Sequence, residues 1–192
     1  MRAALKYKIS AFATAAALLA CLCLAGCGGV DATEATASLA EQLDCVTSAD
    51  SAETQALLQG IDFYPQDYGI SYGCFASTYF AKFSYEIGEA DQELSSEDEI
   101  YLPLTVETYD FEPVRSCMLA AADAAEAAGV DVTQEGYADE HFDQLADPQS
   151  WQRLSLSCTI VMQRSDDGTW SNTTQQTMAA LLLGGYDPSQ AQ

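Results

Sequence analysis

The clearest indication of the fold comes from residues 153–162, which read Arg-Leu-Ser-Leu-Ser-Cys-Thr-Ile-Val-Met. Apolar and polar side chains alternate along this stretch, which is the pattern of a β-strand with one buried face and one solvated face. Asp166-Asp167-Gly168 follows as a turn, and Thr169 to Thr173 predicts a returning strand. Together these residues predict an antiparallel hairpin.

Two further strands are predicted upstream of this hairpin. Alternation from Phe83 to Ile87 ends at Gly88, and a stronger alternation runs from Ile100 to Val106 after an acidic loop. Pro103 lies inside the second run and has no N–H for a ladder. We therefore expect that strand to be an edge strand or to bulge at the proline.

Helical spacing predicts several helices around these strands. Asp31 and Glu34 have the spacing of a capping box, which would begin the first helix. The other helices are expected to end at glycines or to start at a proline. The predicted helices cover residues 31–48, 54–58, 65–83, 117–128 and 177–183, with a helical turn at 141–145 in an otherwise loop-like stretch.

The third of these helices carries a dense stripe of aromatic side chains. They recur at steps of four, three, four and four residues, which places them on one helix face. The stripe consists of Tyr68, Tyr72, Phe75, Tyr79 and Phe83. Such a stripe indicates a packed core, with the wall of a ligand pocket as the alternative.

Helices followed by mostly antiparallel strands predict an α+β fold with the N-terminal helices packed on one face of a curved sheet. The order of elements resembles the NTF2-like (cystatin-like) folds of small secreted bacterial lipoproteins. The resemblance is carried by Phe83–Gly88, Ile100–Val106 and Ile160–Trp170, and would span residues 31–185. It implies a cone between sheet and helices, whereas the stretch 117–148 departs from the simple pattern.

The N-terminal segment predicts where the protein is located. Arg2, Lys6 and Lys8 precede a short apolar run that ends in Leu24-Ala25-Gly26-Cys27. A basic start, an apolar run and small residues before a cut describe a secretory signal. The ending resembles the lipobox of bacterial lipoproteins, which implies that Cys27 is lipidated and that the signal is removed before it. An uncleaved anchor, or an ordinary signal with a chance cysteine, are the alternatives.

This interpretation divides the chain into four parts. They are a signal peptide at 1–26, the lipidated cysteine with a short tether at 27–30, a single α+β domain at 31–185 and a disordered tail at 186–192. Without the signal, four basic residues face 29 acidic ones. Phosphates would be repelled, so nucleic acid is excluded as a partner, and the lipid must supply the attachment to the membrane.

Four cysteines remain in the predicted domain, and an exported protein permits disulfides. Four cysteines allow three pairings. Cys45 and Cys74 lie on the flanks of two helices that can pack against each other, which favours Cys45–Cys74 with Cys117–Cys158. Four buried thiols are the alternative.

The candidate catalytic and metal-binding motifs in this sequence are weak. His141 is flanked by carboxylates, but neighbouring residues on a helix point in different directions, so we expect neither a metal site nor a catalytic base there. Residues 95–99 and 165–168 are rich in carboxylates but lack the spacing of a calcium loop. We predict no catalytic residues, no metal and no cofactor.

If the cone holds a pocket, aromatic side chains are the candidates to line it, since apolar pockets with a few hydroxyls suit small amphipathic ligands. The candidates are Tyr68, Tyr72, Tyr79, Tyr101 and Trp170.

The sequence therefore predicts a lipid-anchored extracytoplasmic lipoprotein that binds a small ligand or an unknown envelope protein and is not an enzyme. Two alternatives stay open. One is an NTF2-like enzyme for a small apolar substrate, with a desolvated carboxylate in the cone. The other is a structural or adhesive protein whose acidic surface bridges cations.

Overall fold

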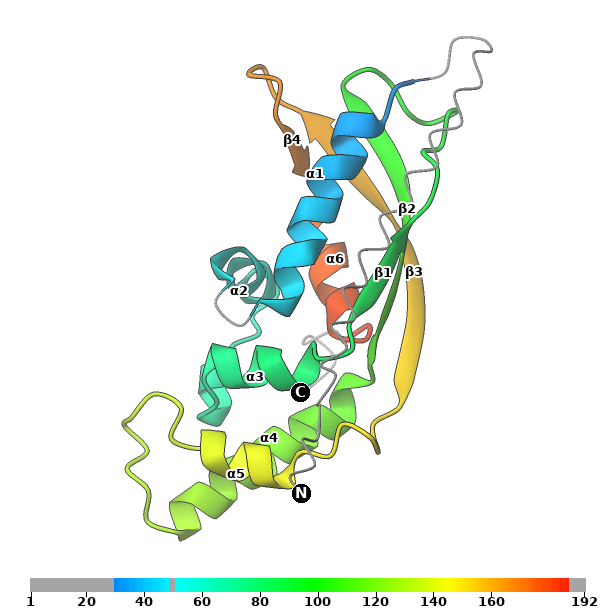
Figure 1. Ribbon diagram of the computed structural model, residues 1–192. Coiled ribbons are helices and arrows are strands. Elements are labelled where there is room, and N and C mark those ends of the chain that lie inside the picture. Colours follow the sequence, from blue (N-terminus) through cyan, green and yellow to red (C-terminus); the bar gives the residue numbers. More distant parts are fainter. Residues whose placement is uncertain (1–29, 49–50, 187–192) are drawn as a thin grey trace, which may run out of the picture.

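The computed structural model describes residues 30–48 and 51–186. The predicted signal, Cys27 and nearly all of the predicted tail therefore lie outside the described residues. The elements appear in Figure 1 in this order: α1 (Thr33–Asp44), η1 (Cys45–Thr47), α2 (Ala52–Gln59), η2 (Pro65–Tyr68), α3 (Tyr72–Tyr79), β1 (Ser84–Ile87), β2 (Glu99–Tyr109), α4 (Phe111–Ala127), α5 (Asp139–Leu145), β3 (Arg153–Arg164), β4 (Trp170–Asn172) and α6 (Gln175–Leu182).

The described strands form one sheet in the order β1-β2-β3-β4, and every neighbouring pair is antiparallel. This confirms the predicted α+β fold. The β2–β3 pair is the longest, with a register that runs from Glu99 opposite Gln163 to Tyr109 opposite Arg153. Buried and more exposed residues alternate along β2 as the apolar and polar residues do in its sequence. Ile100, Leu102, Leu104 and Val106 are all buried.

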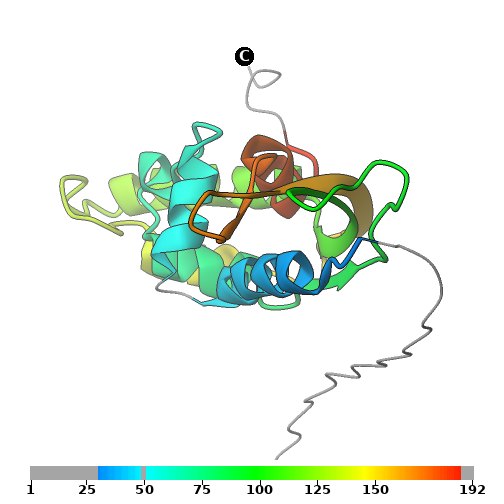
Figure 2. The same ribbon diagram turned by 90° about the horizontal axis from the view of Figure 1, so that it is seen from above.

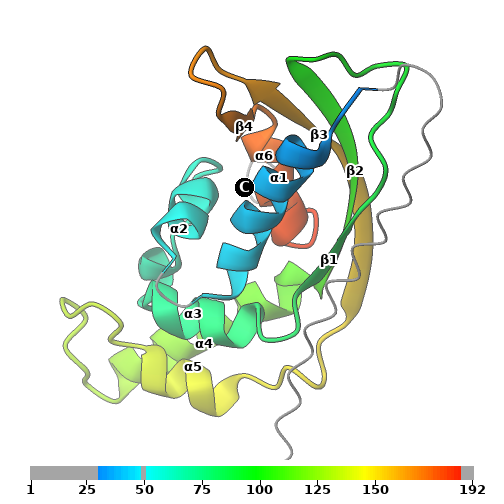
Figure 3. The same ribbon diagram turned by 45° about the horizontal axis from the view of Figure 1, so that its top comes forward.

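The helices lie on one side of the curved sheet, as Figure 3 shows for α1 and α6. Hydrogen bonds connect both helices to the strands beneath them. The Tyr85 hydroxyl of β1 donates to the Asp44 carboxylate at 2.6 Å, and the Thr108 hydroxyl of β2 donates to the Leu182 carbonyl at 3.0 Å. The buried side chains form one core cluster that continues from α1 through the sheet to α5.

Pro103 lies where β2 loses its neighbour β1, and its pairing with β3 continues without a bulge. β2 pairs with β1 on one side and β3 on the other, but β1 ends at Ile87, opposite Leu104. The carbonyl of Pro103 accepts from Gly88 N–H at 2.8 Å. In an antiparallel strand the N–H and C=O of one residue point to the same side. The missing N–H therefore faces the place where β1 leaves the sheet, so no ladder bond is lost.

The predicted start of the first helix and the predicted continuity of the third are wrong. The N-cap of α1 is Ala32, without a side-chain cap, because Asp31 instead accepts from Thr33 N–H at 3.0 Å. The continuous helix predicted over 65–83 is interrupted. Gly69 takes a left-handed conformation with φ +71° after η2, and Ser71 then caps α3 as a new helix.

The helix predicted over 117–128 begins earlier, at Phe111. Asp110 is its N-cap and accepts from Glu112 N–H at 3.2 Å. The buried face then recurs every three or four residues, through Phe111, Val114, Met118, Ala121 and Ala125. Gly129 follows the helix with φ +77°, as expected for a C-terminal glycine.

A carboxylate joins α5 to the start of α3. Asp139 accepts from the Ser71 N–H at 2.7 Å and from the Ser71 hydroxyl at 2.6 Å. The same hydroxyl oxygen accepts from Cys74 N–H at 3.3 Å as the helix cap. This connects segments nearly 70 residues apart. In the view from above, the loop between α4 and α5 projects at one end of the molecule (Figure 2).

The hairpin between β3 and β4 depends on one aspartate. The Asp167 carboxylate accepts from the Ser165 hydroxyl and from the hydroxyl and N–H of Thr169. These hydrogen bonds, with the Ser165 hydroxyl first, lower the pKa of Asp167 to about 2.

We expect this turn to titrate at unusually acidic pH. Because the folded pKa is lowered, the stabilisation is complete above the unfolded pKa of about 3.9 and is lost as pH falls through about 2. An NMR titration of the Asp167 carboxyl carbon measures this directly. A midpoint near 4 would contradict the hydrogen-bonded turn.

Candidate functional site

Concave space opens between the C-terminal part of α1, α2, β4 and the start of α6. We call it the α2–β4 groove, and its volume is about 340 Å³. Four segments separated in the sequence supply its lining: Gln42 of α1; Glu53, Thr54, Ala56 and Leu57 of α2; Trp170, Ser171 and Asn172 of β4; and Gln175 and Met178 of α6.

Two buried polar residues fix the floor of the groove. Thr54 is 2% exposed, and its N–H donates to the Ser51 hydroxyl that caps α2. Asn172 is 4% exposed and accepts from the N–H of Thr174 at 2.7 Å and from its hydroxyl at 2.8 Å. These bonds connect the floor of the groove to the residues at which α2 and α6 begin.

Trp170 supplies the aromatic wall. Its backbone carbonyl accepts from the Ser38 hydroxyl at 3.1 Å, which holds β4 against α1. Its indole Nε1 is buried and has no hydrogen-bond partner in the part of the chain that the structure describes. An indole N–H usually finds a partner when it is buried. The indole N–H is therefore covered by protein, and the groove meets other atoms of the Trp170 residue.

The groove has one ionisable side chain, Glu53, which is exposed at its rim. The other polar groups are amides and hydroxyls, and no Lys, Arg or His lines it. The side-chain amides of Gln42 and Gln175 make no hydrogen bonds within the described residues. The groove thus combines apolar surface, neutral donors and acceptors, and one negative charge.

Of the five aromatic residues predicted to line a pocket, only Trp170 lies on this groove. Tyr79 is 1% exposed in the core and donates to the Tyr109 carbonyl at 2.8 Å, and its burial raises its pKa. Tyr72 is also buried, which raises its pKa to about 12. Its hydroxyl lies near the groove residue Thr54 but forms no well-aligned hydrogen bond.

The other two tyrosines lie elsewhere. Tyr68 is on η2. Tyr101 is on β2, where its hydroxyl donates to the Glu99 carboxylate at 2.8 Å and this bond raises its pKa. The structure therefore does not bring the five predicted residues together. The residues that sequence reasoning missed are Gln42, Thr54, Asn172 and Gln175. For Asn172 and Gln175 the available signal was the absence of charge from Gly168 to Tyr186 in a very acidic chain, whereas no such signal marks Gln42 or Thr54.

No known protein family matches this chain. No curated protein and no solved structure matches it either. The groove must therefore be interpreted from its own chemistry. None of the helices among the described residues is both long enough and apolar enough to cross a bilayer.

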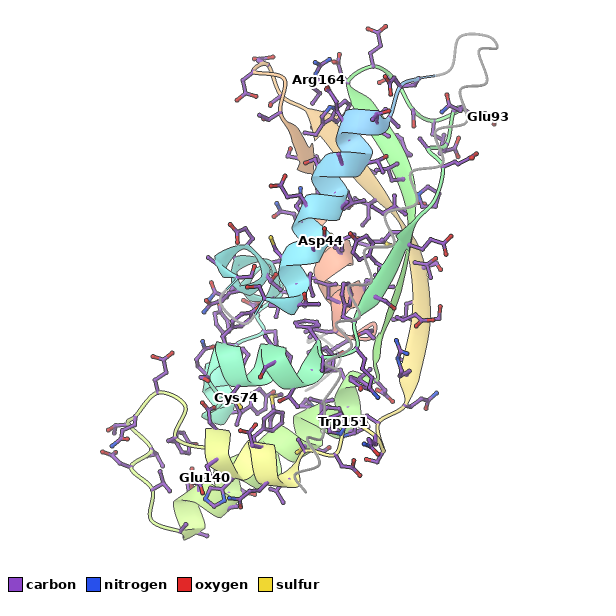
Figure 4. The ribbon with its side chains drawn as sticks, in the orientation of Figure 1. Asp44, Cys74, Glu93, Glu140, Trp151 and Arg164 are labelled. Carbon is purple, nitrogen blue, oxygen red and sulfur yellow. The ribbon has the colours of Figure 1, made fainter. Side chains whose placement is uncertain are left out.

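The four cysteines of the domain are free thiols in the structure and lie on four different elements. The predicted pairs Cys45–Cys74 and Cys117–Cys158 are thus not formed in it, and they stay predictions for the oxidised protein, to be tested by non-reducing peptide mapping. The Cys74 thiol instead donates to the Asp143 carboxylate at 3.4 Å, toward α5 (Figure 4). Burial, with Asp139 and Asp143 nearby, raises the pKa of Cys74 to about 12, so its thiol is protonated at neutral pH.

The remaining charged motifs do not line the groove. Glu140 and His141 are on α5, at the opposite end of the molecule from Arg164 and the β3–β4 turn (Figure 4). Ser95 and Ser96 accept from the N–H groups of Tyr101 and Glu99, so they shape a loop. Within the described ranges, no three His, Cys, Asp or Glu side chains are placed to hold a metal ion.

The core side chains pack between the sheet and the helices. The buried polar side chains among the described residues are Ser51, Thr54, Thr108 and Asn172, and none of these is a carboxylate. The desolvated carboxylate that the enzyme alternative requires is therefore not found in the described interior.

Proposed function

We propose that this chain is a lipid-anchored binding protein on the outer side of a bacterial cytoplasmic membrane, and that the α2–β4 groove is its ligand site. The observation that carries the proposal is the groove itself, a concave site with an aromatic wall, a buried polar floor and no positive charge. Ligand sites commonly combine apolar lining with a few convergent polar groups.

The groove favours a small amphipathic ligand without negative charge. Trp170, Leu57 and Met178 offer apolar contact, and the Gln42 and Gln175 amides can pair with hydroxyl or amine groups. An anionic ligand would approach Glu53 and a strongly acidic protein without a compensating cation in the lining. A neutral polyhydroxy head group and an ammonium head group both satisfy these conditions.

Anchoring is supported by the sequence Leu24-Ala25-Gly26-Cys27 and by the short tether that joins it to α1. The test is metabolic labelling with radioactive palmitate in a bacterial host. We expect the wild-type chain to carry label and to fractionate with membranes, whereas Cys27→Ser carries none and is released. Equal labelling of both chains would refute the anchor, without bearing on the groove.

Ligand binding is tested by the fluorescence of Trp170. The chain has two tryptophans, so Trp151→Phe leaves Trp170 as the only indole. Three probes with the same tail are compared: hexyl glucoside, hexyltrimethylammonium and hexyl sulfate. We expect the first two to change the emission saturably, and hexyl sulfate to have no effect.

Matched variants on α2 then assign the effect to the groove. Ala56 lines the groove and is exposed, so Ala56→Phe should fill the space and abolish binding. Ala52 is exposed on the same helix but outside the groove, so Ala52→Phe should bind as the parent does. Equal binding by the two variants, or no response to any probe, would refute the assignment.

A further inference from the structure

The outer edge of β3 is open over most of its length. β3 pairs with β2 from Arg153 to Gln163, but β4 covers it only from Met162 to Arg164. In Figure 1, β4 accordingly meets only one end of the long strand.

Hydrogen bonds at the end of the open stretch show which residues face outward. Val161 donates its N–H to the Thr174 hydroxyl, and its carbonyl accepts from Thr173 N–H, both on the side away from β2. Because strand residues alternate in the direction of their backbone groups, Ser155, Ser157 and Thr159 also face this side. None of their backbone N–H or C=O groups on this edge has a partner among the described residues.

This edge lacks the protections that strand edges usually carry. Natural edges are blunted by charged side chains, prolines, bulges or a covering segment. Here the three outward residues have short, exposed hydroxyl side chains. Leu154, Leu156 and Cys158 alternate with them on the face toward the helices and are only half-buried. A strand added here would gain hydrogen bonds and also cover apolar side chains.

The edge also lies in a stretch of this very acidic chain that has few acidic residues. No Asp or Glu occurs between Asp147 and Asp166, and no charged residue occurs from Gly168 to Tyr186, which includes α6 beside β3. The chain as a whole has a net charge of −22. Two copies would repel each other through most of their surfaces, but not through this edge.

We propose that β3 is a dimerisation edge, on which β3 of a second copy pairs antiparallel about Ser157. In this register Ser157 lies opposite its own counterpart, and Ser155 lies opposite Thr159 of the second copy in both directions. Every open backbone group of these three residues is then paired. The two sheets become one continuous sheet across a two-fold axis, which is the commonest symmetry of protein dimers.

A second copy fits this edge better than an unrelated strand because the edge is self-complementary. An antiparallel pair presents identical patterns of donors and acceptors from both sides. Hydroxyl side chains face hydroxyl side chains in the proposed register, and cross-strand Ser and Thr pairs stabilise sheets. No charged residue is placed opposite another within the paired stretch 154–160.

The first test is the mass of the full chain in a mild detergent, measured by sedimentation at about 10 μM, where a micromolar dimer is populated. We expect a dimer. Ser157→Pro removes an N–H that faces the edge and not β2, so the fold should survive while the dissociation constant rises roughly tenfold or more. Ser157→Ala keeps the N–H and should dimerise as the wild type does. A monomeric wild-type chain would overturn the proposal.

Two charge substitutions at Ser157 test the register of the proposed pairing without removing a backbone N–H. Ser157→Asp and Ser157→Lys each place like charges opposite each other at the axis, and each should weaken the dimer several-fold. An equimolar mixture should restore it, since Asp then faces Lys. Dimers unaffected by either substitution, or a mixture that behaves as the average of its parts, would refute pairing about Ser157. This outcome is independent of whether Ser157→Pro folds.

Discussion

Phe75→Ala is expected to lower the free energy of unfolding by about 4 kcal/mol, the typical cost of removing a large buried aromatic ring. Phe75 is completely buried at the centre of an aromatic cluster. Its ring centroid lies 5.1 Å from that of Tyr79, 5.2 Å from Phe63 and 5.9 Å from Phe80. The cluster joins α3 to the segment after α2 and to α4, so the cavity cannot close by the movement of one element.

Urea denaturation followed by circular dichroism measures this loss. The control is Leu94→Ala, because Leu94 is a large apolar residue that is 60% exposed. Its substitution should change stability by less than about 0.5 kcal/mol. A loss below about 1.5 kcal/mol for Phe75→Ala would mean that the cluster is not the closely packed core described above.

Gly184→Ala is expected to cost about 3 kcal/mol. Gly184 follows α6 with φ +64°, a conformation that costs an L-residue roughly 1 kcal/mol. A Cβ here would also lie 2.5 Å from the Tyr109 carbonyl oxygen and 3.3 Å from the Phe111 nitrogen. Backbone atoms cannot move aside as a flexible side chain does, and the added overlap costs about 1–3 kcal/mol.

Gly129→Ala is the matched control for the contribution of this contact. Gly129 has a similar φ of +77°, but no atom lies within 4 Å of the position of its Cβ. Its substitution should cost only about 1 kcal/mol, from the backbone conformation alone. The difference between the two variants measures the overlap with Tyr109. Equal losses would show that α6 does not rest on the end of β2 as described.

The strands could be predicted from the sequence because burial alternates residue by residue in a half-buried strand. β2 and β3 are therefore visible in Ile100–Val106 and in Arg153–Met162. The α+β class follows from the order of the elements.

The break before α3 could not be predicted in the same way. The aromatic residues keep helical spacing across it, but Gly69 is fixed in a left-handed conformation beside Tyr137. A Cβ on Gly69 would lie 2.3 Å from that ring. Ser71 is engaged by Asp139 of α5. Both partners are almost 70 residues away in the sequence, so no local pattern reveals the break.

The groove could be predicted only in part for a similar reason. Trp170 was visible as an aromatic residue after a turn, but the polar floor combines Thr54 with Asn172, more than 100 residues apart. Tyrosines are common in ligand pockets, which is why they were predicted to line one, but Tyr72 and Tyr79 lie in the core. Periodicity identifies which face of a helix is apolar, but not whether that face meets packed side chains or open space.

Pro103 sets the length of the neighbouring strand. Its ring replaces the N–H that the next residue of β1 would have accepted, so the regular ladder between β1 and β2 ends at Ile87. Beyond the proline the contacts come from a loop: the carbonyl of Tyr101 accepts from Asp91 N–H at 3.0 Å, and its N–H donates to the Ser95 hydroxyl. One imino acid thus makes β2 an interior strand at its C-terminal half and a lateral strand at its N-terminal half.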